Sequence, residues 1–174
     1  QTILLTKTAG EVPIAVFGEH NMKNLNGAKL ILEEFGIEDD QFYRSIATFK
    51  GAAKRLELLG KNDRTIIYRD FAHEPSKVMA TTKAVKELFP KRKLVACFEL
   101  HTFSSLNPEF LPEYKDTLSE ADLQVIFYSP HTLEIKKMKA ISDEEIRNYF
   151  GNGDIRVFTD KLIFEEFLKN QNWN

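Results

Sequence analysis

Residues 94–100 read LVACFEL, a nearly continuous run of apolar side chains. Such runs are typical of strands in parallel sheets, because helices cover both faces of those sheets. Two further runs have the same character, VIFYS at 125–129 and IRVFT at 155–159. We therefore expect parallel strands at these three places, and we interpret Cys97 in the first of them as a buried thiol.

Helical patterns separate the apolar runs. Residues 75–89 begin with a proline that suits a first helical turn, and they repeat apolar residues every three or four positions. Ser142 and Glu145 have the spacing of a capping box. Strands that alternate with helices predict an α/β fold, with a Rossmann-like, mostly parallel sheet and helices on both faces. The predicted helices span 75–89, 107–118, 142–150 and 160–169.

The beginning of the chain has a different organisation. Residues 2–8 and 13–17 predict a hairpin, and two helical patterns follow, the first closing at Gly36. This segment has too few strands to bury a core of its own, so we expect it to be the end of a larger α/β domain. A change in composition at residues 49–53 places a domain boundary there, which gives domains at 1–48 and 49–174. The second domain opens with two strands, 55–60 and 65–72.

Composition excludes several classes of function. The chain has 174 residues, a net charge of −2 and one cysteine, so it offers neither a disulfide nor a cysteine metal cluster. The charge gives no reason to expect nucleic acid or a membrane as partner, and no apolar stretch approaches the roughly 20 residues of a membrane span. The sequence lacks phosphate-loop, GxGxxG, GxSxG and HExxH motifs. We expect a cytoplasmic protein with no metal site in these residues.

Polar residues gather where the predicted strands end. Asp70 and His73 lie between a strand and the amino end of a helix, where α/β sheets bind ligands and anions. His101 and Thr102 follow the strand 94–100 in the same way. For Asp70 and His73 the alternative is that the two side chains only satisfy their own turn. The residues alone therefore indicate a ligand-binding edge without a complete catalytic set.

The stretch GEHNMKN at 18–24 raises the same choice at the start of a helix. Asn21 is a reasonable N-cap residue, and Asn24 lies one turn further on the same side. A cap explains one asparagine better than two. Arg55 and Glu57 alternate in a predicted strand, and His131 precedes the basic stretch IKKMK; both features are compatible with a solvated surface.

Three motifs in order, GEHNMKN (18–24), FKGAAKRLE (49–57) and RDFAHEP (69–75), resemble the Mur ligase family of ATP-dependent amide ligases that make peptidoglycan precursors. CFELHTF at 97–103 points to the branch that links an amine to muramate. The resemblance implies that 1–48 is the C-terminal part of the central ATP-binding domain. It further implies that 49–174 is the C-terminal Rossmann-like domain without its last strand and helix, and that this fragment alone is inactive.

The resemblance also implies a reaction and a set of binding residues. ATP, with Mg²⁺, would phosphorylate the carboxylate of UDP-N-acetylmuramate, and the amine of L-alanine or of the murein tripeptide would attack the acyl phosphate, in peptidoglycan synthesis or recycling. No catalytic residue is implied within these residues. The implied ATP-binding residues are His20, Asn21, Asn24, Arg55 and Asp70, and the implied amine-substrate residues are His73, His101 and Thr102.

Two departures from the family pattern bear on the amine substrate. Alanine-linking members commonly have arginines where Thr102 and Ser105 stand, so this sequence favours the peptide as the amine. Glu74 replaces a histidine found in many relatives. The alternatives are a non-catalytic nucleotide- or partner-binding α/β module and the related folate-polyglutamate ligases, which the FELHTF segment disfavours.

Overall fold

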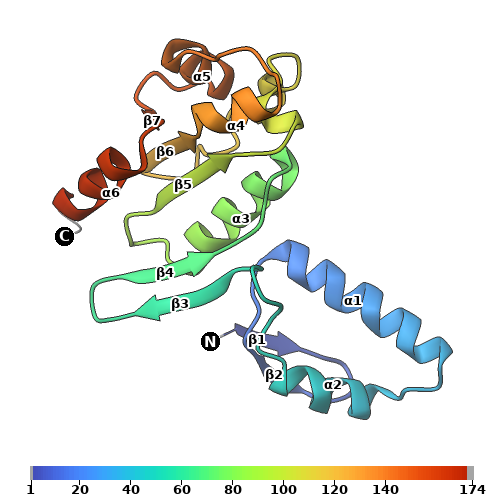
Figure 1. Ribbon diagram of the computed structural model, residues 1–174. Helices are drawn as coiled ribbons and strands as arrows, with labels where there is room; N and C mark the ends of the chain where they lie inside the picture. Colours follow the sequence, from blue (N-terminus) through green and yellow to red (C-terminus); the bar gives the residue numbers. More distant parts are fainter. Residues whose placement is uncertain (1, 172–174) are drawn as a thin grey trace. The chain divides into compact units, whose positions relative to one another are not determined.

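The computed structural model describes residues 2–171 and divides the chain into two compact units (Figure 1). The N-terminal unit comprises residues up to Asn62 together with Ile66–Phe71. The C-terminal unit comprises Asp63–Thr65 and the chain from Ala72 onward. None of the helices in residues 2–171 combines the length and the apolar character that crossing a bilayer requires.

The N-terminal unit contains two antiparallel hairpins and two helices. The first hairpin pairs β1 with β2, and the second pairs β3 with β4 through a register shift between Leu58 and Gly60. The first hairpin was expected from the sequence, whereas the second was expected only as two strands, 55–60 and 65–72. The elements are β1 (Thr2–Leu5), β2 (Glu11–Ile14), α1 (Glu19–Glu34), α2 (Asp39–Thr48), β3 (Glu57–Lys61) and β4 (Ile66–Arg69).

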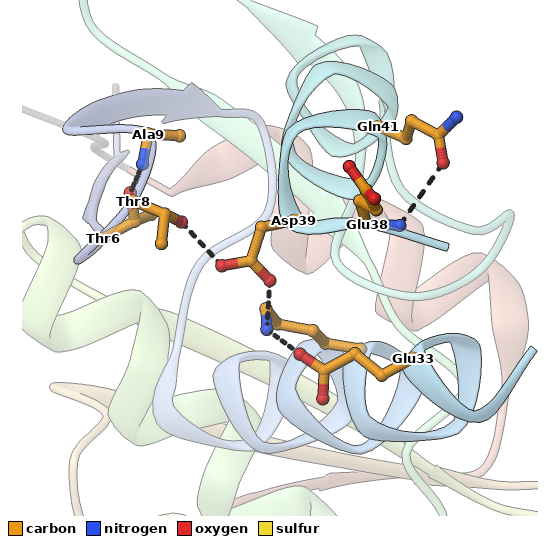
Figure 2. A network of polar contacts seen from close by, with 8 residues as sticks. Thr6, Thr8, Ala9, Glu33, Glu38, Asp39 and Gln41 are labelled. Carbon is orange, nitrogen blue, oxygen red and sulfur yellow. Dashed lines mark hydrogen bonds and ion pairs between the residues drawn. The ribbon is translucent and has the colours of Figure 1, made fainter. Parts of the chain in front are cut away.

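A polar cluster joins three elements of this unit (Figure 2). The ammonium of Lys29, on α1, forms ion pairs with Glu33 and with Asp39 at the start of α2, the latter at 2.5 Å. Thr8, in the β1–β2 turn, donates a hydrogen bond of 2.6 Å to the same Asp39 carboxylate. The hydrogen bonds from Lys29 and then Thr8 lower the pKa of Asp39. The cluster therefore links both α1 and the β1–β2 turn to the start of α2.

The C-terminal unit is an α/β layer structure around a three-stranded sheet. Its strand order is β5-β6-β7 and all pairs are parallel, with Leu100 opposite Tyr128 and Phe127 opposite Phe158. This confirms the predicted parallel α/β fold. The elements are α3 (Pro75–Leu88), β5 (Val95–Leu100), the 3₁₀ turns η1 (Ser104–Leu106) and η2 (Leu111–Tyr114), β6 (Leu123–Tyr128), α4 (Pro130–Ile135), α5 (Asp143–Phe150), β7 (Arg156–Phe158) and α6 (Lys161–Asn170).

The main core of this unit is apolar and contains two stacked aromatic rings. Tyr114 and Phe150 are stacked with their centroids 5.4 Å apart, and Phe98 of β5 lies against both. A second aromatic group, Phe127 and Phe158 of the sheet, packs against α6. Fully buried members of the main core are Leu100, Leu106, Leu111, Tyr114, Leu118, Ile126, Ile146, Phe150 and Ile155.

The prediction that β5 is covered on both faces was wrong. Phe98 and Leu100 are buried, but Cys97 and Glu99, which alternate with them, are exposed. In the sheet that residues 2–171 form, β5 is an edge strand that pairs with β6 alone, while the rings of α6 pack against β6 and β7. The residue Cys97 is therefore exposed, contrary to the prediction, although partial burial of its thiol raises the pKa to about 11.

The helix predicted for 107–118 was also wrong. Within this segment only the 3₁₀ turn η2 (Leu111–Tyr114) and irregular turns form, and Pro112 has no N–H to continue an α-helix. The loop predicted around His131 is instead α4.

The two compact units divide at a different place from the predicted domain boundary. Residues 49–62 group with the N-terminal unit. Within that unit Phe17 contacts Tyr68 of β4 edge to face, with centroids 5.4 Å apart, so the second hairpin shares its apolar contacts with the first part of the chain. The assignment of 1–48 and 49–174 to parts of two ligase domains stays a prediction.

Candidate functional site

Arg55 lies in a turn whose backbone is held in an unusual conformation. The residues on either side of it, Lys54 and Leu56, have φ angles of 57° and 45°. Residues other than glycine rarely adopt such positive φ angles. The carboxylate of Asp70 accepts a hydrogen bond of 2.7 Å from the Leu56 N–H. Asp70 thus stabilises the turn that presents Arg55, and Arg55 precedes β3 instead of lying within it as predicted.

Glu57 supports the same turn from its other end. Its carboxylate accepts hydrogen bonds of 2.8 Å from the Lys54 N–H and 2.9 Å from Arg69. These two hydrogen bonds, the backbone one first, lower the pKa of Glu57. The Glu57 carboxylate therefore already binds the turn and Arg69. Arg55 forms no ion pair with any carboxylate in residues 2–171.

Arg55 and Phe71 border a shallow hollow. The guanidinium carbon lies 6.0 Å from the centroid of the Phe71 ring, and the phenyl side chain is 44% exposed. The hollow measures about 170 Å³ and is lined by Ala53, Lys54, Arg55 and Phe71. An unpaired guanidinium beside an exposed aromatic face suits a ligand that combines an anionic group with a flat ring.

The start of α1 corrects the predicted cap. Gly18, with φ of 87°, is the N-cap residue, and Asn21 lies inside the first turn. The Asn21 amide nitrogen donates a hydrogen bond of 2.8 Å to the carbonyl of buried Phe17, whereas its amide oxygen accepts none from the described residues. His20 is half-buried and Asn24 is exposed; neither side chain forms a hydrogen bond within residues 2–171. Polar groups for a ligand thus remain at this helix start.

All five predicted ATP-binding residues fall in the N-terminal unit. The sequence had placed Arg55 and Asp70 in the second domain, apart from His20, Asn21 and Asn24. The structure groups them in one unit because β3 and β4 belong to it. Whether they contact a nucleotide stays a prediction.

The predicted amine-substrate residues lie in the C-terminal unit. His73 is half-buried just before α3, and its carbonyl accepts a hydrogen bond of 2.5 Å from the hydroxyl of Tyr114. Glu74 occupies the N-cap position of α3 and forms an ion pair of 3.1 Å with Lys77. The Glu74 carboxylate thus lies at the start of α3, beside the ammonium of Lys77 in its first turn.

His101 and Thr102 follow β5 at the carboxyl edge of the sheet. The Thr102 hydroxyl donates to Ser105 at 2.9 Å and accepts the Ser105 N–H at 3.0 Å, while the Ser105 hydroxyl accepts the Thr102 N–H at 3.0 Å. These reciprocal bonds engage the side chain of Thr102 in its own turn. The His101 ring lies 3.3 Å from the carbonyl of Glu99.

Sequence reasoning missed a cation at this edge. The ammonium of Lys136 lies 3.6 Å from the centroid of the Phe103 ring, which is 64% exposed. Lys136 follows β6, whose last residue is paired in parallel with the last residue of β5, so both segments leave the same edge of the sheet. Lys136 forms no ion pair within the described residues. The position of IKKMK after a parallel strand was the signal that could have identified it.

Known proteins with similar sequences are ligases. The chain is 29% identical to UDP-N-acetylmuramate–L-alanine ligase from Streptococcus mutans over an alignment of 187 positions. The alignment covers 92% of this chain and 40% of that protein. No protein-family model matches the chain. The chain is similar in sequence to Mur ligases over most of its length. It spans about 40% of the length of this Mur ligase relative.

Solved structures of Mur ligases share the fold. UDP-N-acetylmuramate–alanine ligase from Thermotoga maritima matches 93% of the chain with a TM-score of 0.68 and 18% identity, over 34% of that protein. Murein peptide ligase from Psychrobacter arcticus matches 95% of the chain with a TM-score of 0.62 and 20% identity, over 34% of its length. Both comparisons support the α/β architecture of this chain.

Proposed function

We propose that this chain is part of an ATP-dependent ligase that joins an amine to the carboxylate of UDP-N-acetylmuramate. The observation that carries the proposal is the turn at residues 54–57, which Asp70 and Glu57 hold so that an unpaired Arg55 faces a hollow beside Phe71. The names of the sequence relatives supply the reaction class.

In this proposal the N-terminal unit contacts the nucleotide. Bound ATP supplies the phosphoryl group that activates the carboxylate. Arg55 offers a delocalised cation to a phosphate, and Phe71 offers a ring face to the base. His20, Asn24 and the amide oxygen of Asn21 supply donors and acceptors at the start of α1. Asp70 contributes to the ribose site while it holds the Leu56 N–H.

The C-terminal unit binds the amine substrate at the carboxyl edge of its sheet. His73 stands beside the incoming amine, and His101 and Thr102 border the site after β5. Catalysis then rests on positioning the amine against the activated carboxylate. Mg²⁺ was also predicted, but residues 2–171 contain no group of three or more histidine, cysteine, aspartate or glutamate side chains that could hold a metal. No step is therefore assigned to the ion.

A substrate screen tests the proposal on the whole enzyme that contains this chain. With UDP-N-acetylmuramate, ATP and magnesium, we expect amine-dependent phosphate release, faster with the murein tripeptide than with L-alanine, because Thr102 and Ser105 replace the arginines common in alanine-linking members. Faster release with L-alanine would reverse the substrate preference. No release with either amine, despite ATP binding, would instead support a non-catalytic nucleotide-binding module.

A further inference from the structure

Tyr114 is a fully buried residue with a hydrogen bond to the chain at His73. Its side chain is 0% exposed, and its ring stacks on Phe150 at 5.4 Å and an interplanar angle of 19°. Its hydroxyl donates a hydrogen bond of 2.5 Å to the carbonyl of His73, a residue 41 positions earlier in the chain. A ring packed on two sides directs this hydroxyl in one direction only.

The segment around His73 is fixed on both sides of that hydrogen bond. Ala72 packs against the core cluster that contains Tyr114. The carbonyl of Glu74 accepts hydrogen bonds of 2.9 Å from the N–H groups of Lys77 and Val78 in the first turn of α3. The His73 carbonyl lies between Ala72 and Glu74, which are both held in place. The hydrogen bond from Tyr114 adds a contact at His73 itself.

We propose that Tyr114 is a positioning residue for the amine substrate, acting through the backbone of His73. The inference rests on the proposed function, because it takes His73 to be beside the amine. Without the tyrosine hydroxyl the backbone at His73 loses one of its contacts, and we expect the imidazole to shift with it. A displaced imidazole contacts the amine less well, so both the binding of the amine and the rate of its attack decrease.

The hydroxyl remains a donor at every pH at which the enzyme would work. Burial, together with the nearby charge of Glu74, raises the pKa of Tyr114 to about 12. The tyrosine is therefore protonated and uncharged near neutral pH, and its hydrogen bond to a neutral carbonyl does not depend on pH in that range.

The chain offers a matched control for the experiment. Tyr128 is likewise buried, and its hydroxyl donates a hydrogen bond of 2.5 Å to a main-chain carbonyl, that of Ile141. Tyr114→Phe and Tyr128→Phe each remove one hydroxyl from the same kind of bond. We expect similar decreases of the unfolding midpoint in urea, because each variant leaves one carbonyl without its donor.

Activity separates the two variants in the whole enzyme. We expect Tyr114→Phe to raise the KM for the amine substrate about tenfold, with the KM for ATP unchanged, and Tyr128→Phe to leave both within about twofold. His73→Ala should raise the KM for the amine at least as much. In a spectrum of ¹⁵N-histidine-labelled enzyme, the His73 ring signal, identified by its loss in His73→Ala, should shift in Tyr114→Phe only.

The outcomes distinguish the two levels of the inference. If His73→Ala leaves the KM for the amine unchanged, the proposed role of His73 is wrong, and the role of Tyr114 falls with it. If His73→Ala raises that KM while Tyr114→Phe behaves like Tyr128→Phe, the proposed function stands and Tyr114 is only a core residue.

Discussion

Asp70 shows how one side chain can serve structure and ligand binding together. The sequence offered two interpretations of this residue, a turn residue and a ribose ligand. The structure shows that Asp70 is a turn residue, because its carboxylate accepts a hydrogen bond from the Leu56 N–H. Leu56 has a positive φ, and this contact stabilises it. The second stays a proposal. Replacement of Asp70 therefore affects the fold as well as any nucleotide affinity.

Two substitutions at Asp70 separate these effects. We expect Asp70→Ala to lower the free energy of unfolding by about 1–3 kcal/mol, because the Leu56 N–H loses its acceptor. Asp70→Asn keeps an oxygen acceptor and should lose much less. Urea unfolding followed by circular dichroism measures both. Equal losses for the two variants would show that the hydrogen bond contributes little. If only Asp70→Ala, and not Asp70→Asn, weakens ATP binding, then the residue acts on the nucleotide through the turn alone.

At the scale of elements, the ends of helices are set by short-range signals. Ser142 and Glu145 form the expected capping box of α5, and Asp160 accepts hydrogen bonds from the N–H groups of Leu162 and Ile163 in α6. These predictions were correct because the bonds involve neighbours in the sequence. The start of α1 was misplaced because Gly18 caps it without any side chain.

The attachment of α1 to α2 makes a prediction about pH. The hydrogen bonds from Lys29 and Thr8 lower the pKa of Asp39 below its usual 3.8. A carboxyl whose pKa is lower in the folded state contributes stability above its unfolded pKa, and that contribution is lost as the pH falls through the folded pKa. Lys29→Met should therefore reduce stability at pH 7, and the difference from the unmodified chain should shrink below about pH 4.

Lys23→Met is the control for that measurement. Lys23 is on the same helix and forms an ion pair with Glu19, but the two side chains are 75% and 70% exposed. Exposed pairs contribute little to stability. Urea unfolding at several pH values should show almost no effect of Lys23→Met. An effect of Lys29→Met that is equally small, or that does not change with pH, would contradict the role given to the cluster.

At the scale of the whole molecule, the edge position of β5 makes a prediction about Cys97. Because the residue is exposed, its thiol should react with a disulfide reagent without denaturant, to one equivalent per chain, but slowly at neutral pH because partial burial raises the thiol pKa to about 11. The absorbance of the released thiolate measures the reaction, and the same chain in urea gives the complete value. A thiol that reacts only in urea would restore the prediction of a buried cysteine.

The sequence by itself determined the order and type of most elements, the parallel sheet and the resemblance to Mur ligases. Those features depend on apolar periodicity, on short-range caps and on motifs such as RDFAHEP, which are all local. Local signals also led to the helix wrongly expected at 107–118, where Pro112 lacks the N–H that an α-helix needs and a 3₁₀ turn forms instead.

Only the tertiary structure decided which residues share a unit and which side chains are already engaged. Arg55 and Asp70 joined the unit of Asn21, Cys97 became exposed at a sheet edge, and Tyr114 reached the backbone of His73. Each of these facts depends on contacts between residues distant in the chain. Such contacts are set by how whole elements pack, and no local pattern of residues encodes them.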